Sequence, residues 1–174
     1  MYDFDELEEL EKGWIFYTAA LGCLRQIALN LKGDKILDFG CGTGIGMALL
    51  KAIYPQKEFY GIEPSAKAKP FWDARNLNIL VCGGEKVPLE SKHFDTVFSS
   101  HVLEHIKDAE KALKESIRLA KQRVIHIVPD GDVHRENHLH IFNRVNLRKL
   151  VGEDAVIYHL PDLYMNSLVI IIDL

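Results

Sequence analysis

The sequence predicts an α/β protein whose core is a doubly wound, mostly parallel sheet of seven strands. The first observation is that apolar runs of strand length alternate with helix-length segments from residue 34 onward. The second is a glycine-rich turn directly after the first of these runs, where such sheets bind ligands. The third is a pair of strand-like runs at the C-terminal end, which are separated by a Pro-containing turn and should pair antiparallel.

The first 33 residues are expected to be helical. Apolar residues recur at steps of three and four from Leu7 to Leu31, which places them on one helical face. Gly13 and Gly22 weaken this pattern, so one helix or two can precede the sheet. Trp14 and Tyr17 lie on the apolar face; burial is their default interpretation, and contact with cofactor or substrate is the alternative.

The remaining elements follow in a regular order. The expected strands cover residues 35–39, 58–62, 78–82, 94–99, 123–128, 155–160 and 167–173. The expected helices cover residues 44–54, 65–76 and 107–120, the first of which must stop before Pro55. Since no repeat or linker interrupts the pattern, we expect one domain over residues 1–174, formed by the helical segment 1–33 and the core 34–174.

Composition narrows the functional classes. The net charge is −4 and no dense run of Lys or Arg occurs, which does not favour nucleic acid or an anionic membrane as partner. The three cysteines stand in unrelated contexts, which predicts neither disulfides nor a thiolate metal site and favours the cytoplasm. The longest apolar run, 168–172, is too short to span a bilayer, and the acidic residues 1–11 do not resemble a signal peptide.

The glycine-rich turn reads Asp38-x-Gly40-x-Gly42-x-Gly44. It fits neither the dinucleotide fingerprint, which needs glycines at relative positions 1, 3 and 6, nor a phosphate loop ending in Gly-Lys-Ser/Thr. A carboxylate at Asp38 would repel a pyrophosphate but attract the ammonium group of a methionine moiety. The turn therefore indicates a nucleotide site, but not one for a dinucleotide.

With this motif the sequence resembles the class I S-adenosylmethionine-dependent methyltransferases, specifically the small type-11-like branch. The resemblance implies a Rossmann-like fold, S-adenosylmethionine as cofactor and S-adenosylhomocysteine as product. It also implies that the first motif holds the methionyl part of the cofactor through Asp38, Phe39, Gly40, Cys41, Gly42 and Gly44.

Further segments follow in the order of the family. Residues 61–65 match the end of the second strand, which implies that Glu63, next to Pro64, accepts hydrogen bonds from the two ribose hydroxyls. Residues 87–89 and 93–105 resemble the fourth-strand region, whose loop passes the sulfonium. The resemblance implies cofactor contacts there from Ser99, Ser100 and His101.

The sequence departs from the family at two places. Where relatives commonly carry an Asp that binds adenine, this chain has Gly83, followed by Gly84 and Glu85, so backbone groups or Glu85 are expected to hold the adenine. There is also no insertion between the fifth strand and the terminal hairpin that is large enough to form a lid. We expect the N-terminal helices, residues 130–140 or a second subunit to capture substrate, which leaves monomer and homodimer open.

Methyl transfer from a sulfonium is an in-line displacement, so positioning is its main requirement. If the acceptor is a hydroxyl or a protonated amine, His101 or His105 is expected to act as the base, with His138 as a further substrate-side candidate. No base is needed for a carbon acid, a thiolate or a free amine. His134, His138 and His140 lack a cysteine or carboxylate at a familiar spacing, so no metal site is expected.

The motif after the fourth strand narrows the acceptor. Ser99-Ser100-His101 is neither the Asn/Asp-Pro-Pro-aromatic signature of adenine or glutamine methylation nor a Pro-Cys nucleophile, and the acids of metal-assisted catechol methylation are missing. A small molecule with an oxygen or nitrogen nucleophile is the leading hypothesis. The alternatives are a cofactor-binding module or non-catalytic partner of another methyltransferase, and a nicotinamide oxidoreductase that would bind NAD.

Overall fold

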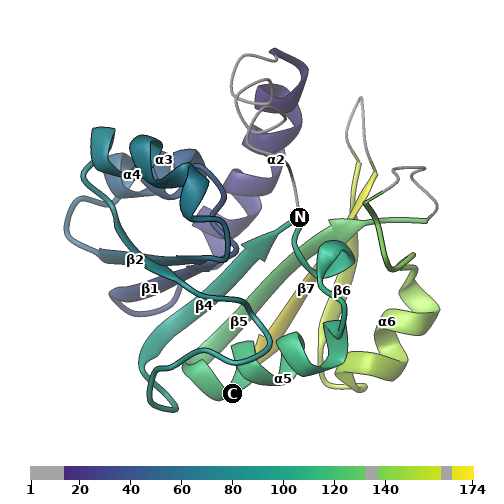
Figure 1. Cartoon of the computed structure of the whole chain (residues 1–174). Coiled ribbons are helices and arrows are strands. Elements are labelled where there is room, and N and C mark those ends of the chain that lie inside the picture. Colours follow the sequence, from purple (N-terminus) through teal and green to yellow (C-terminus); the bar gives the residue numbers. More distant parts are fainter. Residues whose placement is uncertain (1–13, 132–136, 162–165) are drawn as a thin grey trace.

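The computed structural model describes residues 14–131, 137–161 and 166–174, with side chains from Leu21 onward. Figure 1 shows one twisted sheet with helices on both faces. Its seven strands are ordered β3-β2-β1-β4-β5-β7-β6, which confirms the predicted sheet. Their bounds are β1 (Lys35–Phe39), β2 (Glu58–Glu63), β3 (Asn78–Val81), β4 (Phe94–Ser100), β5 (Ala120–Pro129), β6 (Val156–Leu160) and β7 (Ser167–Asp173).

Helices cover the two faces of this sheet (Figure 1). The helices are α2 (Trp14–Asn30), α3 (Ile45–Ile53), α4 (Lys69–Ala74), α5 (Ala109–Leu119) and α6 (Arg144–Val151), with 3₁₀ turns η1 (Ala66–Ala68) and η2 (Leu103–His105). Neighbouring side chains of a strand point to opposite faces of the sheet. Because helices cover both faces, the side chains of β1 are buried in two different core layers. Ile36 packs in the core layer that contains Ile27 of α2 and Met47 of α3, while Leu37 packs in the opposite layer, below α5 and α6.

The strand order determines where the candidate site lies. Strand β1 pairs in parallel with β2 on one side and with β4 on the other, so the chain leaves β1 in one direction and later returns to its opposite edge. The carboxyl ends of parallel strands separate at such a switch point and leave a crevice there. Strand β7 runs antiparallel to both β5 and β6, as expected for the terminal hairpin.

Helix α2 continues through Gly22 without a break, which is one of the two arrangements that the sequence left open. The other helices differ from the prediction at two places. The helix expected at 65–76 is divided into η1 and the short α4. Helix α6 was not predicted, because Leu147 is its only buried residue and its apolar periodicity is weak. A capping box starts it instead: Asn143 accepts hydrogen bonds from the first turn, and the Asn146 side chain accepts the Asn143 amide.

A fully buried histidine, His126 of β5, fixes the packing of β4 against α5. Ser116 donates to the Leu113 carbonyl at 2.7 Å, so its hydroxyl oxygen accepts from Nε2 of His126 at 2.9 Å. The Ser99 hydroxyl then donates to Nδ1 at 2.6 Å. Both ring nitrogens of one neutral tautomer are therefore satisfied, and burial lowers the pKa of His126 to about 3.

This buried histidine should make the protein sensitive to acid. The unfolded chain binds a proton at His126 below its ordinary pKa of 6.5, whereas the folded protein binds it only near pH 3, so stability falls as the pH drops through this window. We expect a loss of about 2 kcal/mol from this residue between pH 7 and pH 5. Urea unfolding at both pH values, compared with His126→Gln, measures it. Equal pH dependence in the two proteins would contradict the assignment.

Candidate functional site

The candidate site lies at the crevice beyond β1, where a turn leads into α3. Three glycines of this turn have positive φ angles: 86° at Gly40, 53° at Gly42 and 79° at Gly44. Side chains other than glycine rarely adopt this left-handed conformation. The turn thus favours glycine at each of these positions.

The three glycines differ in what surrounds them. A Cβ atom at Gly40 would lie 2.6 Å from Cγ1 of Val102, and one at Gly44 would lie 2.4 Å from Cδ1 of Leu77. A Cβ atom at Gly42 would have no described atom within 4 Å. Gly40 and Gly44 are thus needed for packing within the protein, while Gly42 borders the open space in which a ligand can approach the backbone.

Hydrogen bonds from two neighbouring segments hold the turn in place. The amides of Gly40 and Cys41 both donate to the Ile62 carbonyl of β2, at 2.9 and 3.0 Å. The indole nitrogen of Trp72, a buried residue of α4, donates to the Gly42 carbonyl at 2.7 Å. The sequence analysis missed Trp72. The signal was a tryptophan in a predicted helix, because a tryptophan that becomes buried needs a hydrogen-bond acceptor for its indole N–H.

Glu63 ends β2 directly beside this turn. Its Oε2 accepts the amide of Gly42 at 3.0 Å, and its Oε1 accepts the amide of Ser65 at 3.0 Å. Burial raises the pKa of Glu63 in spite of these two bonds. Each carboxylate oxygen has a second lone pair, so the side chain can still accept two hydroxyl groups from a ligand.

Asp38 lies in β1 on the approach to the turn and is buried. Burial and, secondarily, repulsion from Glu63 raise the pKa of Asp38 to about 8. The carboxyl group is thus largely protonated at neutral pH in the ligand-free protein. A cationic group placed beside it favours the charged form, so this position is suited to an ammonium ligand.

The other first-motif residues contribute mainly backbone. The side chain of Phe39 is fully buried in the core layer below α5. Burial, followed by the charges of Asp38 and Glu63, raises the pKa of the Cys41 thiol far above its ordinary value, so it stays protonated and unreactive. Cys41, Cys23 and Cys82 are all free thiols. Pro64 is exposed beyond Glu63.

The residues predicted to hold adenine have different surroundings. Gly83 is exposed and has open space at its Cβ position. A Cβ atom at Gly84 would lie 2.5 Å from Cε1 of Phe39, so this glycine permits close packing. Glu85 accepts the Asp108 amide at 2.9 Å, which ties its carboxylate to the start of α5. Among these three residues, Gly83 has the most accessible backbone.

The three residues predicted at the end of β4 have different surroundings. The Ser99 side chain is fully buried and bonded to His126, so it points into the core and away from the crevice. Ser100 is half-buried at the end of the strand. His101 follows with a φ angle of 56° and donates its amide to the Ile127 carbonyl at 2.8 Å. This conformation turns the chain sharply into η2.

Three of the predicted histidines come together around Glu104, which sequence reasoning missed. Nδ1 of His101 lies 3.3 Å from Oε1 of Glu104, and Nε2 of His105 lies 4.0 Å from the same oxygen. The ring of His138 packs edge-on against His105, with centroids 4.9 Å apart. The signal in the sequence was the spacing His-x-x-Glu-His, in which Glu104 stands between His101 and His105.

The protonation of the first two histidines differs. Burial acts to lower the pKa of His101, but its contacts with Cys23 and with Glu104 outweigh burial and raise the pKa to about 9. Burial lowers the pKa of His105, whose Nδ1 donates to the Asn137 carbonyl at 3.0 Å. At neutral pH the protein therefore holds one charged and one neutral imidazole at this point.

Two groups of predicted residues lie outside the described part of the site. The backbones of Trp14 and Tyr17 belong to α2, but their side chains are not among the described ones. His134 falls in the undescribed segment 132–136. His140 is described and has other partners than His138: its Nε2 donates to the Ile106 carbonyl at 2.9 Å, and its ring stacks on Phe142.

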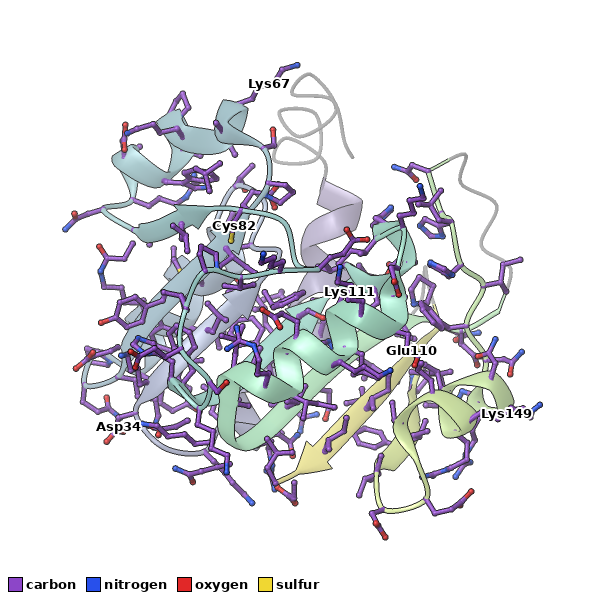
Figure 2. The ribbon with its side chains drawn as sticks, turned by 60° about the horizontal axis from the view of Figure 1, so that its bottom comes forward. Asp34, Lys67, Cys82, Glu110, Lys111 and Lys149 are labelled. Carbon is purple, nitrogen blue, oxygen red and sulfur yellow. The ribbon has the colours of Figure 1, made fainter. Side chains whose placement is uncertain are left out.

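A separate open groove of about 900 Å³ lies between the start of α5 and α6. Figure 2 labels Glu110 and Lys111, which line it from α5, and Lys149, which lies on α6. Phe142 and Asn146 line the opposite side, and of the predicted cofactor residues Glu85 borders it. No residue of the glycine turn lines this groove, so the groove is separate from the turn.

Comparisons with known proteins agree with the chemistry of the turn. The family model described as "Methyltransferase domain" matches residues 37–128, just over half of the chain. An uncharacterized methyltransferase of Anoxybacillus flavithermus is 35% identical over 81 residues, 45% of this chain and 37% of that protein. The ubiquinone/menaquinone biosynthesis C-methyltransferase UbiE of Campylobacter jejuni is 30% identical over 114 residues, 61% of this chain and 48% of that protein.

A tRNA U34 carboxymethyltransferase of Campylobacter concisus is 33% identical over 93 residues, which cover 50% of this chain and 32% of that protein. This chain thus matches about a third to a half of the length of these curated relatives. Each match therefore compares only part of a longer protein with this chain.

Solved structures show the same fold over nearly the whole chain. A possible histamine N-methyltransferase of Thermotoga maritima superposes with a TM-score of 0.72 at 22% identity, covering 96% of this chain and 93% of that one. An S-adenosylmethionine-dependent methyltransferase of Aquifex aeolicus gives 0.74 at 16% identity, with 98% of each chain covered. None of the described helices is long and apolar enough to cross a membrane. The chain belongs to the methyltransferase domain family of class I S-adenosylmethionine-dependent enzymes, with a Rossmann-like fold.

Proposed function

We propose that this chain transfers the methyl group of S-adenosylmethionine to an oxygen or nitrogen nucleophile of a small molecule and releases S-adenosylhomocysteine. The observation that carries the proposal is the open position at Gly42, bordered by Glu63. Glu63 accepts the ribose hydroxyls, and Asp38 takes the ammonium of the methionyl part. Backbone groups near Gly83 hold the adenine in place of the usual Asp.

The reaction requires the acceptor to lie in line with the sulfur–methyl bond. The end of β4 provides the acceptor side in this proposal, because Ser100 ends the strand that pairs with β1 and His101 follows it directly. The catalytic residues in this proposal are His101 and His105: for an acceptor that must lose a proton, the neutral His105 accepts it, while the charged His101 can do so only after losing its own proton. For other nucleophiles the protein acts only by positioning the two partners and excluding water.

The relatives define what the proposal must be tested against. One relative is described as a C-methyltransferase and another as a tRNA carboxymethyltransferase, so carbon and RNA acceptors are the direct competitors of a small molecule with a hydroxyl or amine. Assembly and location are part of the same proposal: a monomer or homodimer in the cytoplasm. The acidic net charge of −4 supports a small-molecule acceptor over tRNA.

The test is formation of S-adenosylhomocysteine, followed by mass spectrometry, with a panel of hydroxyl, amine, carbon-acid and tRNA acceptors. We expect turnover with a hydroxyl or amine compound, and a strong loss in His105→Ala but not in His159→Ala, an exposed histidine of β6. Turnover only on carbon or tRNA would overturn the acceptor class. Tight cofactor binding with no turnover on any acceptor would instead support a non-catalytic module.

A further inference from the structure

The carboxylate of Glu104 is buried without adequate compensation. The residue is 1% exposed, and neither of its oxygens accepts a hydrogen bond from any described group. The nearest cationic group is His101, whose Nδ1 lies 3.3 Å from Oε1. Burying an ionised carboxylate is strongly unfavourable unless it is paired and hydrogen-bonded. Among the described residues, this carboxylate therefore lacks a positive partner that contacts both of its oxygens.

The backbone fixes this carboxylate in place. Glu104 lies in η2, and its carbonyl accepts the Leu139 amide at 2.7 Å. The same bond brings residues 137–140 against η2, so that His138 approaches Glu104 and His105. One ligand atom from each of Glu104, His105 and His138 lies within 4.8 Å of the other two.

The orientation of His105 matches what a metal ligand requires. Because the Asn137 carbonyl can only accept, Nδ1 of His105 carries the hydrogen of that 3.0 Å bond. In the neutral ring the lone pair is then on Nε2, the nitrogen that faces Glu104 at 4.0 Å. A backbone carbonyl commonly fixes metal-bound histidines in this way.

We propose that Glu104, His105 and His138 bind a divalent transition-metal ion of the Zn²⁺ type. Two imidazoles and one carboxylate form a ligand set of catalytic zinc sites, which leave the fourth position open. Metal–ligand bonds of about 2.0–2.2 Å require the three side chains to close by about an ångström. Imidazole ligands favour Zn²⁺ or its neighbours over Mg²⁺ and Ca²⁺, which prefer oxygen.

A metal site at this point replaces the expectation from the sequence that none is present. That expectation considered His134, His138 and His140, which have no carboxylate at a familiar spacing in the sequence. The fold supplies the missing carboxylate from η2. If the proposed function also holds, the open metal position can bind the acceptor hydroxyl and lower its pKa, and His105 then acts as a metal ligand in place of acting as the base. Only that extension depends on methyl transfer; metal binding does not.

The test is a titration of Co²⁺ into the full chain after dialysis against a chelator, without S-adenosylmethionine or acceptor. Visible absorbance reports the coordination of Co²⁺, and Zn²⁺ competition reports affinity. We expect the wild-type chain to bind one Co²⁺. The affinity for Co²⁺ should fall by about 100-fold or more in His138→Ala and in Glu104→Gln, and it should not change in the control His159→Ala. Circular dichroism confirms that each variant is folded.

Two results would overturn the proposal. The first is the absence of Co²⁺ and Zn²⁺ binding to the folded wild-type chain, in which case His101 alone neutralises Glu104. The second is equal affinity in the wild type and in folded His138→Ala, which would place the ion elsewhere. Either result leaves the methyl-transfer assay unaffected, so failure of the metal site and failure of the proposed function are distinguishable.

Discussion

Replacing Glu63 by glutamine should weaken binding of S-adenosylhomocysteine by about 100-fold, equivalent to about 2.7 kcal/mol. The carboxylate accepts two backbone amides and can accept two ribose hydroxyls, and hydrogen bonds to a charged group contribute about 1.5–3 kcal/mol each. A glutamine side chain at this position would keep only one accepting oxygen. Its NH₂ group would face either the Gly42 or the Ser65 amide, so the turn would also lose an anchor.

Isothermal titration calorimetry measures this effect directly. Glu58→Gln is a matched control, because Glu58 begins the same strand and is exposed beside Tyr60. We expect the control to bind as the wild type does. A Glu63→Gln protein that is folded and binds with unchanged affinity would show that this carboxylate does not hold the cofactor.

Binding of S-adenosylmethionine should strengthen as the pH rises from 6 to 8. With a pKa of about 8, Asp38 is protonated over most of this range and must lose its proton to accept the ammonium group. Below that pKa a coupled deprotonation changes affinity by up to about tenfold per pH unit. We therefore expect a gain of up to about 100-fold, with release of nearly one proton per ligand at about pH 6.5.

Calorimetry in two buffers of different ionisation enthalpy counts the released protons. Asp38→Asn should bind weakly and show a nearly flat pH profile, while Asp34→Asn, an exposed residue before β1, should keep the wild-type profile. Equal pH profiles in wild type and Asp38→Asn would contradict the role of Asp38. In the ligand-free protein the same raised pKa reduces stability as the pH increases from about 4 to about 8, so unfolding experiments provide a second check.

The fold was largely predictable from local pattern. The strands of residues 35–39 and 167–173 have the observed bounds, because their apolar runs are buried on both faces and end at glycine or polar residues. Helix α6 was not predictable by periodicity, since its start depends on the polar pair Asn143 and Asn146. In a helix that buries few residues, hydrogen-bonded caps and not apolar periodicity determine where the helix begins.

The site was predictable only where the chain is locally constrained. The glycine turn and Glu63 follow from strand ends, and the structure brings them into contact. The family resemblance implies a cofactor contact for Ser99, but strand alternation puts this side chain on the same side as Val97, facing α5. The cluster at Glu104 was missed because His138 reaches it through tertiary folding and not through sequence spacing.

A crystal structure with S-adenosylhomocysteine will decide whether the crevice beyond β1 binds the cofactor. We predict ribose hydroxyls on the carboxylate of Glu63, the amino group beside Asp38 and the ligand in the open space at Gly42. Ligand bound instead in the groove between α5 and α6, with the glycine turn empty, would show that the cofactor site has been assigned to the wrong part of the molecule.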